Sequence, residues 1–84
     1  MPKSLHKPPS KIKAQVSFGA ALRAAREQRA ITQEKLAELA ELHTNYVSSV
    51  ERGERNLSLH NIAKLAYALG MPVSTLVKCL DPIS

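Results

Sequence analysis

The residues best suited to contacting another molecule lie together near the middle of the chain. The run His43-Thr44-Asn45-Tyr46 is followed by two serines, Ser48 and Ser49. An asparagine side chain can form two hydrogen bonds with the edge of adenine, and threonine can offer its methyl group to thymine or its hydroxyl to several bases. These residue types, grouped at one place, are suited to reading base edges in a DNA groove.

Residues 33–51 have the pattern of two short helices joined by a tight turn, which can carry such side chains into a major groove. Thr32 can cap a helix that begins at Gln33, and a second helix is expected from His43 or Thr44 to about Arg52. A small residue is needed where the two helices cross, and Ala37 occupies that position. The apolar residues that bracket the turn and hold the second helix are Leu36, Leu42, Val47 and Val50.

The remaining chain predicts three more helices and no strands. Ser17 can cap a helix from about Phe18 to Arg29, and Gly53 is expected to end the helix that carries Val47 and Val50. Ser58 can cap a fourth helix that Gly70 closes, and Ser74 opens a short fifth helix to about Leu80. The expected fold is therefore all-α, with five short helices in one domain over residues 17–84.

Composition and charge favour a binding module. The net charge is +5, and the first 15 residues contain Lys3, Lys7, Lys11 and Lys13 but no acidic residue. With three prolines in the same stretch, residues 1–16 are predicted to form a flexible basic arm, either a solvated tail or a loose contact with a polyanion. The sequence has no 18-residue apolar run and no signal-peptide pattern, and its single cysteine, Cys79, fits a reducing compartment. A cytoplasmic, nucleoid-associated location is expected.

An enzyme is not expected. Cys79 and the three histidines (His6, His43 and His60) show no ligand spacing, and no glycine-rich phosphate loop is present. We therefore predict no catalytic residues, no metal, no cofactor and no small-molecule ligand.

The run ITQEKLAELAELHTNYVSSVERG, with SLHNIAKLAYALGMPVSTLV after it, resembles the Xre/Cro-C1 class of helix-turn-helix regulators. Within that class, YVSSVERGERNLSL resembles the controller proteins of restriction–modification systems. The resemblance covers roughly residues 17–80. It implies a lambda-repressor-like domain and a dimeric transcription regulator that binds double-stranded DNA upstream of its own gene. A phage-type repressor, another Xre regulator and an antitoxin of the same fold remain alternatives.

The resemblance also implies roles for individual residues. Base reading falls on Thr44, Asn45, Ser48 and Ser49. Contacts with the DNA backbone fall on Gln33, Tyr46, Arg52, Arg55 and Asn56, although Tyr46 is equally suited to packing in the core. Arg26 and Glu51 match a pair expected to form a structural salt bridge.

Three positions depart from the family pattern. The family often has glycine at the positions of Ala30 and Glu41, and a positive φ at Glu41 would cost on the order of 1 kcal/mol. Controller proteins often carry arginine at the position of Thr44, where arginine can grip guanine through two hydrogen bonds. Thr44 cannot do this, so the operator of a relative cannot be assumed here.

One recognition helix reads only a few base pairs, so a two-fold dimer on a pseudo-palindromic operator is expected. The last helix offers an apolar strip for the dimer interface, consisting of Val73, Leu76, Val77 and Leu80. The alternative is that this strip packs entirely on the domain's own core. The sequence does not indicate the operator, the direction of regulation or cooperation between dimers.

Overall fold

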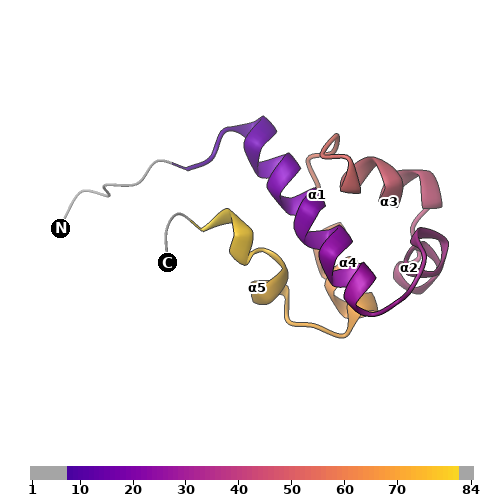
Figure 1. Ribbon diagram of the computed structural model, residues 1–84. Coiled ribbons are helices and arrows are strands. Elements are labelled where there is room, and N and C mark those ends of the chain that lie inside the picture. Colours follow the sequence, from indigo (N-terminus) through magenta and orange to yellow (C-terminus); the bar gives the residue numbers. More distant parts are fainter. Residues whose placement is uncertain (1–7, 82–84) are drawn as a thin grey trace.

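The computed structural model describes residues 8–81 and contains helices and no strands in that range. The elements are α1 (Lys11–Gln28), α2 (Gln33–Ala40), α3 (Thr44–Glu51), α4 (Leu59–Leu69), α5 (Val73–Leu76) and a 3-10 helix, η1 (Lys78–Leu80). The long helix α1 crosses the domain, with α3 on one side of it and α5 on the other (Figure 1). The all-α prediction is confirmed.

Local capping explains most helix boundaries. The Thr32 and Ser58 hydroxyls accept hydrogen bonds from the backbone N–H groups of Lys35 and Asn61, at the starts of α2 and α4. Gly70 ends α4 with a φ of 67°. Gly53, with a φ of 80°, lies just beyond the end of α3. These predicted boundaries are confirmed, because each depends on residues close together in the chain.

The predicted start of the first helix is wrong. It begins at Lys11 instead of Phe18, and the hydroxyl of Ser10, not Ser17, caps it by accepting a hydrogen bond from the Lys13 N–H at 3.1 Å. Residues 11–16, assigned by sequence to the flexible arm, are therefore helical. Of that arm, residues 1–7 lie outside the described part of the chain.

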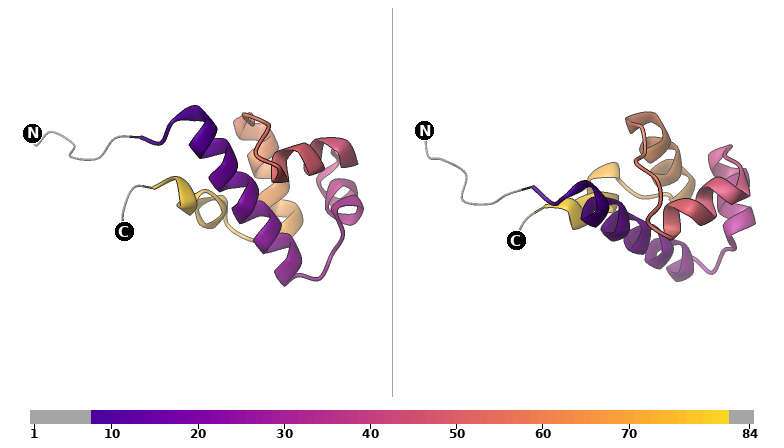
Figure 2. Two further views of the ribbon diagram at one scale, coloured as in Figure 1. Left: turned by 45° about the horizontal axis from the view of Figure 1, so that its top comes forward. Right: turned by 90° about the horizontal axis from the view of Figure 1, so that it is seen from above.

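The predicted fifth helix is interrupted. The α-helical turn begins at Val73, after Pro72, and ends at Leu76, and a separate 3-10 turn follows from Lys78. The two views of Figure 2 show this segment beside the first half of α1, and α5 and η1 both contact α1.

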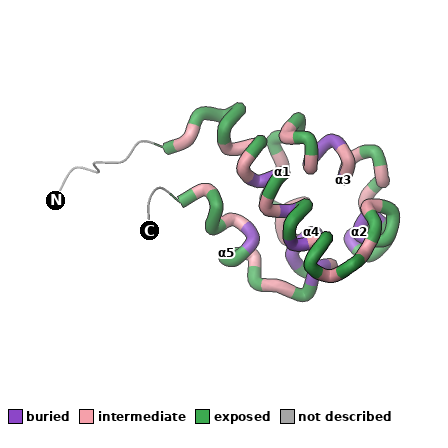
Figure 3. The backbone as a smooth tube through the Cα atoms, viewed as in Figure 1, coloured by how far each residue is buried: buried purple, intermediate pink, exposed green. Residues whose placement is uncertain are grey.

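Burial is concentrated where the helices face one another (Figure 3). The largest fully buried side chains come from all five α-helices: Leu22, Leu36, Val47, Val50, Leu65 and Leu76. Ala37 is buried among them, as the sequence predicted for a small residue at the α2–α3 crossing. Gly19 allows a second close approach, since a Cβ atom there would lie 2.9 Å from the Glu51 carbonyl oxygen. The core thus holds α3 against both α1 and α2.

Candidate nucleic-acid interface

The start of α3 is exposed and polar. Asn45 is exposed and Thr44 half-buried. His43 caps the helix, because its Nδ1 atom accepts a hydrogen bond from the Asn45 backbone N–H at 3.1 Å. The cap satisfies the helix end without using the side chains of Thr44 and Asn45. Both remain positioned to contact an outside molecule.

The two serines further along α3 differ from each other. Ser48 is half-buried, and its hydroxyl accepts a hydrogen bond from Arg52 Nη1. Ser49 is only 4% exposed, donates to the Tyr46 carbonyl oxygen at 2.7 Å and accepts from Arg55 Nε at 3.0 Å. The prediction that Ser49 reads bases is therefore wrong. Its hydroxyl is satisfied inside the protein, which allows a polar residue to occupy the buried face of the helix.

Tyr46 links α3 to α4 and to the loop between them. Its half-buried ring lies 5.7 Å from the Arg55 guanidinium carbon, a distance typical of a cation–π contact. Its hydroxyl accepts a hydrogen bond from Asn61 Nδ2 at 3.1 Å. Arg55 is thus held by Tyr46 and Ser49, and both Arg55 and the neighbouring Asn56 are exposed. The structure presents Arg55 and Asn56 at the edge of α3.

Arg52 is exposed and paired with an acidic residue. Its Nε and Nη2 atoms donate to the two carboxylate oxygens of Glu54 at 3.0 and 3.2 Å. The hydrogen bond and the charge of Glu54 raise the pKa of Arg52, and the hydrogen bond from Arg52 lowers the pKa of Glu54. Arg52 Nη1 also donates to Ser48, so the side chain is held between Glu54 and Ser48, and these bonds use three of its five N–H groups.

The predicted ion pair between Arg26 and Glu51 is present. Arg26 Nε and Nη2 donate to the Glu51 carboxylate at 2.7 and 3.1 Å, and Arg26 Nη1 donates to the Ile31 carbonyl at 2.9 Å. The Glu51 side chain is only 3% exposed. The hydrogen bond to Glu51 is the main cause of a raised pKa at Arg26. The pair therefore joins α1, α3 and the segment before α2.

Gln33 belongs to the same cluster. Its Nε2 atom donates to Glu51 Oε1 at 3.0 Å, which orients the amide at the start of α2. A primary amide has two N–H donors, so one remains for an outside acceptor. The buried pair thus positions a residue that the family resemblance assigned to the DNA backbone.

The apolar strip of the last helix is less available than predicted. Leu76 is only 1% exposed and packs in the core, and Val73 and Val77 pack partly against the same core. The prediction of Leu76 as an interface residue is therefore wrong, because α1 and α4 already cover it. Large exposed apolar side chains lie elsewhere, including Leu59 at 86% and Tyr67 at 82% exposure.

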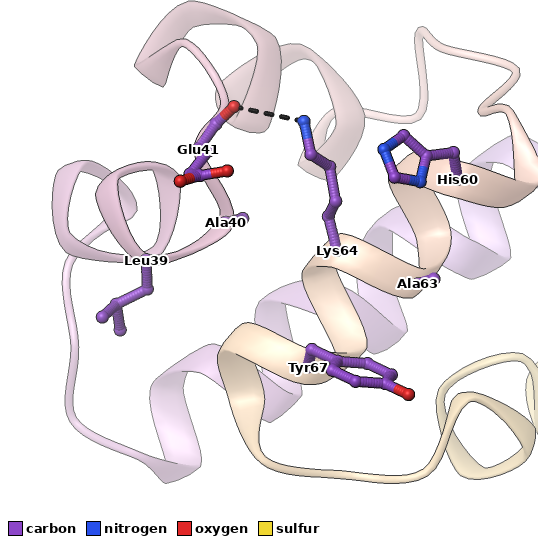
Figure 4. A pocket seen from close by; sticks show the side chains of 7 residues that line it. All are labelled: Leu39, Ala40, Glu41, His60, Ala63, Lys64 and Tyr67. Carbon is purple, nitrogen blue, oxygen red and sulfur yellow. Dashed lines mark hydrogen bonds between the residues drawn. The ribbon is translucent and has the colours of Figure 1, made fainter.

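The turn between α2 and α3 is supported from α4. Glu41 has a φ of 57°, and Lys64 Nζ donates to its carbonyl oxygen at 3.4 Å, as Figure 4 shows. An open hollow of about 350 Å³ lies between the end of α2 and α4. It is lined by Leu39, Ala40, Glu41, His60, Ala63, Lys64 and Tyr67. Glu41 thus adopts the left-handed conformation although it is not glycine, and α2 and α3 remain in contact on either side of the turn. Ala30, the other departure, also has a positive φ, of 55°.

Residues 8–81 contain neither a cluster of metal-ligating side chains nor a membrane-spanning helix. No three His, Cys, Asp or Glu side chains there lie close enough to hold a metal ion. No helix within that range has the length and apolar character needed to cross a membrane. Cys79 is exposed, and partial burial raises the pKa of its thiol.

The segment that carries this interface matches a known protein family. Residues 22–76 match the helix-turn-helix family. The chain belongs to that family. The match covers all of α2, α3 and α4, so the exposed start of α3 is the recognition-helix position of a helix-turn-helix protein.

The resemblance to controller proteins is also confirmed. The chain is 47% identical over 55 residues to control protein C.BamHI from Bacillus amyloliquefaciens, covering 64% of this chain and 68% of the relative. It is 36% identical over 67 residues to control protein C.MunI from a Mycoplasma species, covering 79% and 90%. Among solved structures, the restriction–modification controller protein C.AhdI from Aeromonas hydrophila is 48% identical, with a TM-score of 0.73 and coverage of 74% and 94%.

Four residues that organise this helix-turn-helix protein were not predicted. Asn61 and Lys64 support α3 and the turn before it, and Glu54 orients Arg52. Gln15 donates from its Nε2 atom to the Gly53 carbonyl oxygen at 3.2 Å. No local pattern marks these residues, because each one acts through a partner on another element or in a loop.

Proposed function

We propose that this protein is a sequence-specific DNA-binding transcription regulator, and that it serves as the controller protein of a restriction–modification system. The observation that carries the proposal is the difference between the two ends of α3. Its start is exposed and polar, and its end is anchored by the buried side chain of Glu51, which pairs with Arg26. The relatives named as control proteins of such systems support the specific role.

The base-reading residues in this proposal are Thr44, Asn45 and Ser48. Asn45 is suited to the adenine edge, and Thr44 to thymine or to a base acceptor. Ser48 lies one turn after Thr44, so the two share a face of α3. Because Ser48 already accepts a hydrogen bond from Arg52, its base contact would form together with the arginine.

The backbone-contacting residues surround this face. Gln33 stands at the start of α2, where free N–H groups and the helix dipole favour a phosphate. The other members are Tyr46, Arg52, Arg55 and Asn56, which lie in α3 or the loop after it. Phosphate contacts supply affinity and salt dependence, and base contacts select the site.

A two-fold dimer completes the proposal. Two recognition helices on half-sites about 10 base pairs apart, or a multiple of that spacing, would read a pseudo-palindromic operator upstream of the protein's own gene. Val73, Val77 and Leu80 are the residues of the predicted strip that are not fully buried in the domain's own core.

Val77→Asp should shift sedimentation toward the monomer. A Val77→Asp protein that stays folded and fully dimeric at micromolar concentration would place the interface elsewhere, and Tyr67→Asp would then test α4.

The test of DNA recognition is fluorescence anisotropy with the DNA upstream of the gene and with a random duplex of equal length. We expect tighter binding to the upstream DNA and a steep loss of affinity with salt for both duplexes. Equal affinity for both duplexes in every salt concentration would contradict sequence-specific recognition of this operator.

A further inference from the structure

The first turns of α1 precede the segment that matches the helix-turn-helix family. The family match begins at Leu22, whereas α1 begins at Lys11. In Figure 1 this part of α1 lies along the upper edge of the domain, in line with α3 and the loop that follows it. It therefore stands beside the loop proposed to grip the DNA backbone.

The contact between this extension and the loop is close. Gln15 Nε2 donates to the Gly53 carbonyl oxygen at 3.2 Å. Gly53 has a φ of 80°, and a Cβ atom there would lie 2.9 Å from the Val16 Cα atom. Glycine is thus required at this position both by its backbone conformation and by the approach of α1.

The loop after Gly53 has few other anchors. Gly53 and Glu54 donate backbone hydrogen bonds to Val50 and Ser49, but within the described residues no backbone–backbone hydrogen bond is donated by residues 55–58. Arg55 is held through its side chain, by Ser49 and Tyr46. The orientation of the loop therefore depends on side-chain contacts: Leu57 packs against the core, and Gln15 makes the side-chain hydrogen bond from α1.

The environment of Gln15 indicates that this residue does more than fill space. Its Oε1 atom is buried and has no hydrogen-bond partner among the described residues. A cavity of about 70 Å³ adjoins it, with Arg55, Asn56 and Leu57 on its wall. A buried, unsatisfied amide oxygen is unfavourable for stability, so an apolar side chain of the same length would suit packing alone. What an apolar side chain cannot replace is the hydrogen bond to Gly53.

We propose that Gln15 is a positioning residue, which holds the loop after α3 so that Arg55 and Asn56 meet the DNA backbone. This inference rests on the proposed DNA-binding function. It assigns a role in DNA binding to a helical segment outside the matched family region, without requiring Gln15 itself to touch DNA.

The test compares Gln15→Met with Gln28→Met. Both variants exchange glutamine for methionine in α1, but Gln28 is exposed near the far end of the helix. Gln15→Met should weaken binding to upstream and random duplexes by the same factor, about two- to tenfold, the effect of one hydrogen bond. Gln28→Met should bind like the unmodified protein. The melting temperature of Gln15→Met should be no lower than that of Gln28→Met.

If Gln15 acts on DNA binding through the loop, its effect should depend on Arg55 and Asn56, whereas the effect of a purely structural role would not. In an Arg55→Ala, Asn56→Ala background, Gln15→Met should have no further effect on affinity. Persistence of the full effect in that background would overturn the inference. So would equal affinities of Gln15→Met and Gln28→Met while the unmodified protein binds DNA normally.

Two other outcomes are also decisive. If the unmodified protein binds neither duplex, the proposed function fails and the inference fails with it. If Gln15→Met does not fold, Gln15→Asn replaces it, because the shorter side chain keeps an amide but cannot reach Gly53. Normal DNA affinity of a folded Gln15→Asn protein would overturn the inference.

Discussion

The two ends of α3 are built in opposite ways. At its start, Asn45 is exposed, and the cap comes from His43, so the side chains of Thr44 and Asn45 are left free of the cap. At its end, Val50 is buried and Glu51 accepts hydrogen bonds from Arg26 and Gln33. The eight residues of α3 thus combine an exposed polar start with an anchored end. A rigid end allows an exposed start to keep its direction.

The largest expected effect comes from removing the anchor. Glu51→Ala would leave the guanidinium of Arg26 without its buried partner, so the free energy of unfolding should fall by about 3–5 kcal/mol. Urea denaturation measures this change. Glu38→Ala breaks the exposed pair with Lys35 and should change stability by less than about 1 kcal/mol. Similar losses in the two variants would show that burial does not distinguish the two ion pairs.

The opposite end should respond in DNA recognition and not in stability. Asn45→Ala should lose about 1–3 kcal/mol of discrimination between upstream and random DNA, while the free energy of unfolding changes by no more than about 0.5 kcal/mol. Competition anisotropy measures the discrimination. Asn56→Ala is the matched control, since a backbone contact should weaken both duplexes equally. If Asn45→Ala also weakens both equally, Asn45 does not read a base.

The turn before α3 offers a test of the backbone strain at Glu41. Glu41→Gly removes the strain of a positive φ and should raise the free energy of unfolding by about 1 kcal/mol. Glu38→Gly, inside α2, should lower the free energy of unfolding by about 1 kcal/mol. The two changes are chemically identical and opposite in expected sign. A loss of stability in Glu41→Gly would mean that the glutamate side chain contributes more than the strain removes.

The smallest expected effect concerns Glu54, just beyond the anchored end. Glu54→Gln removes a negative charge beside Arg52 and should raise affinity for random DNA by less than about tenfold. Because Arg52 lowers the pKa of Glu54 in the folded protein, the ion pair favours folding at neutral pH and is lost as the pH falls through the lowered pKa. The difference in melting temperature between variant and unmodified protein should therefore disappear in acid. A difference that persists there would exclude the ion pair as its cause.

The sequence predicted best what depends on neighbouring residues. The predicted caps at Thr32 and Ser58 are confirmed, since each accepts a hydrogen bond from an N–H group three positions later. The family resemblance added the Arg26–Glu51 pair, which joins residues 25 positions apart.

Long-range packing explains what was missed. The early start of α1 was not predicted because Lys11–Val16 has little apolar periodicity, and this segment is supported by the contact of Gln15 with Gly53. The family resemblance assigns Ser49 to base reading, and a serine by itself gives no sign of which side of a helix it faces. Leu76 lies in an apolar strip that suits either a partner or the protein's own core, and its contacts with α1 and α4 decide the matter.

The left-handed residue Ala30 has a consequence for changing the specificity of this protein. Ala30 lies on the short connection between α1 and α2, three residues before Gln33 and on a different connection from the base-reading residues of α3. Ala30→Gly should therefore raise the free energy of unfolding by about 1 kcal/mol without changing the discrimination between upstream and random DNA. New residues at positions 44 and 45 often lower stability before they improve binding. A protein carrying Ala30→Gly would tolerate more of them, which makes it a suitable parent for selecting regulators of new operators.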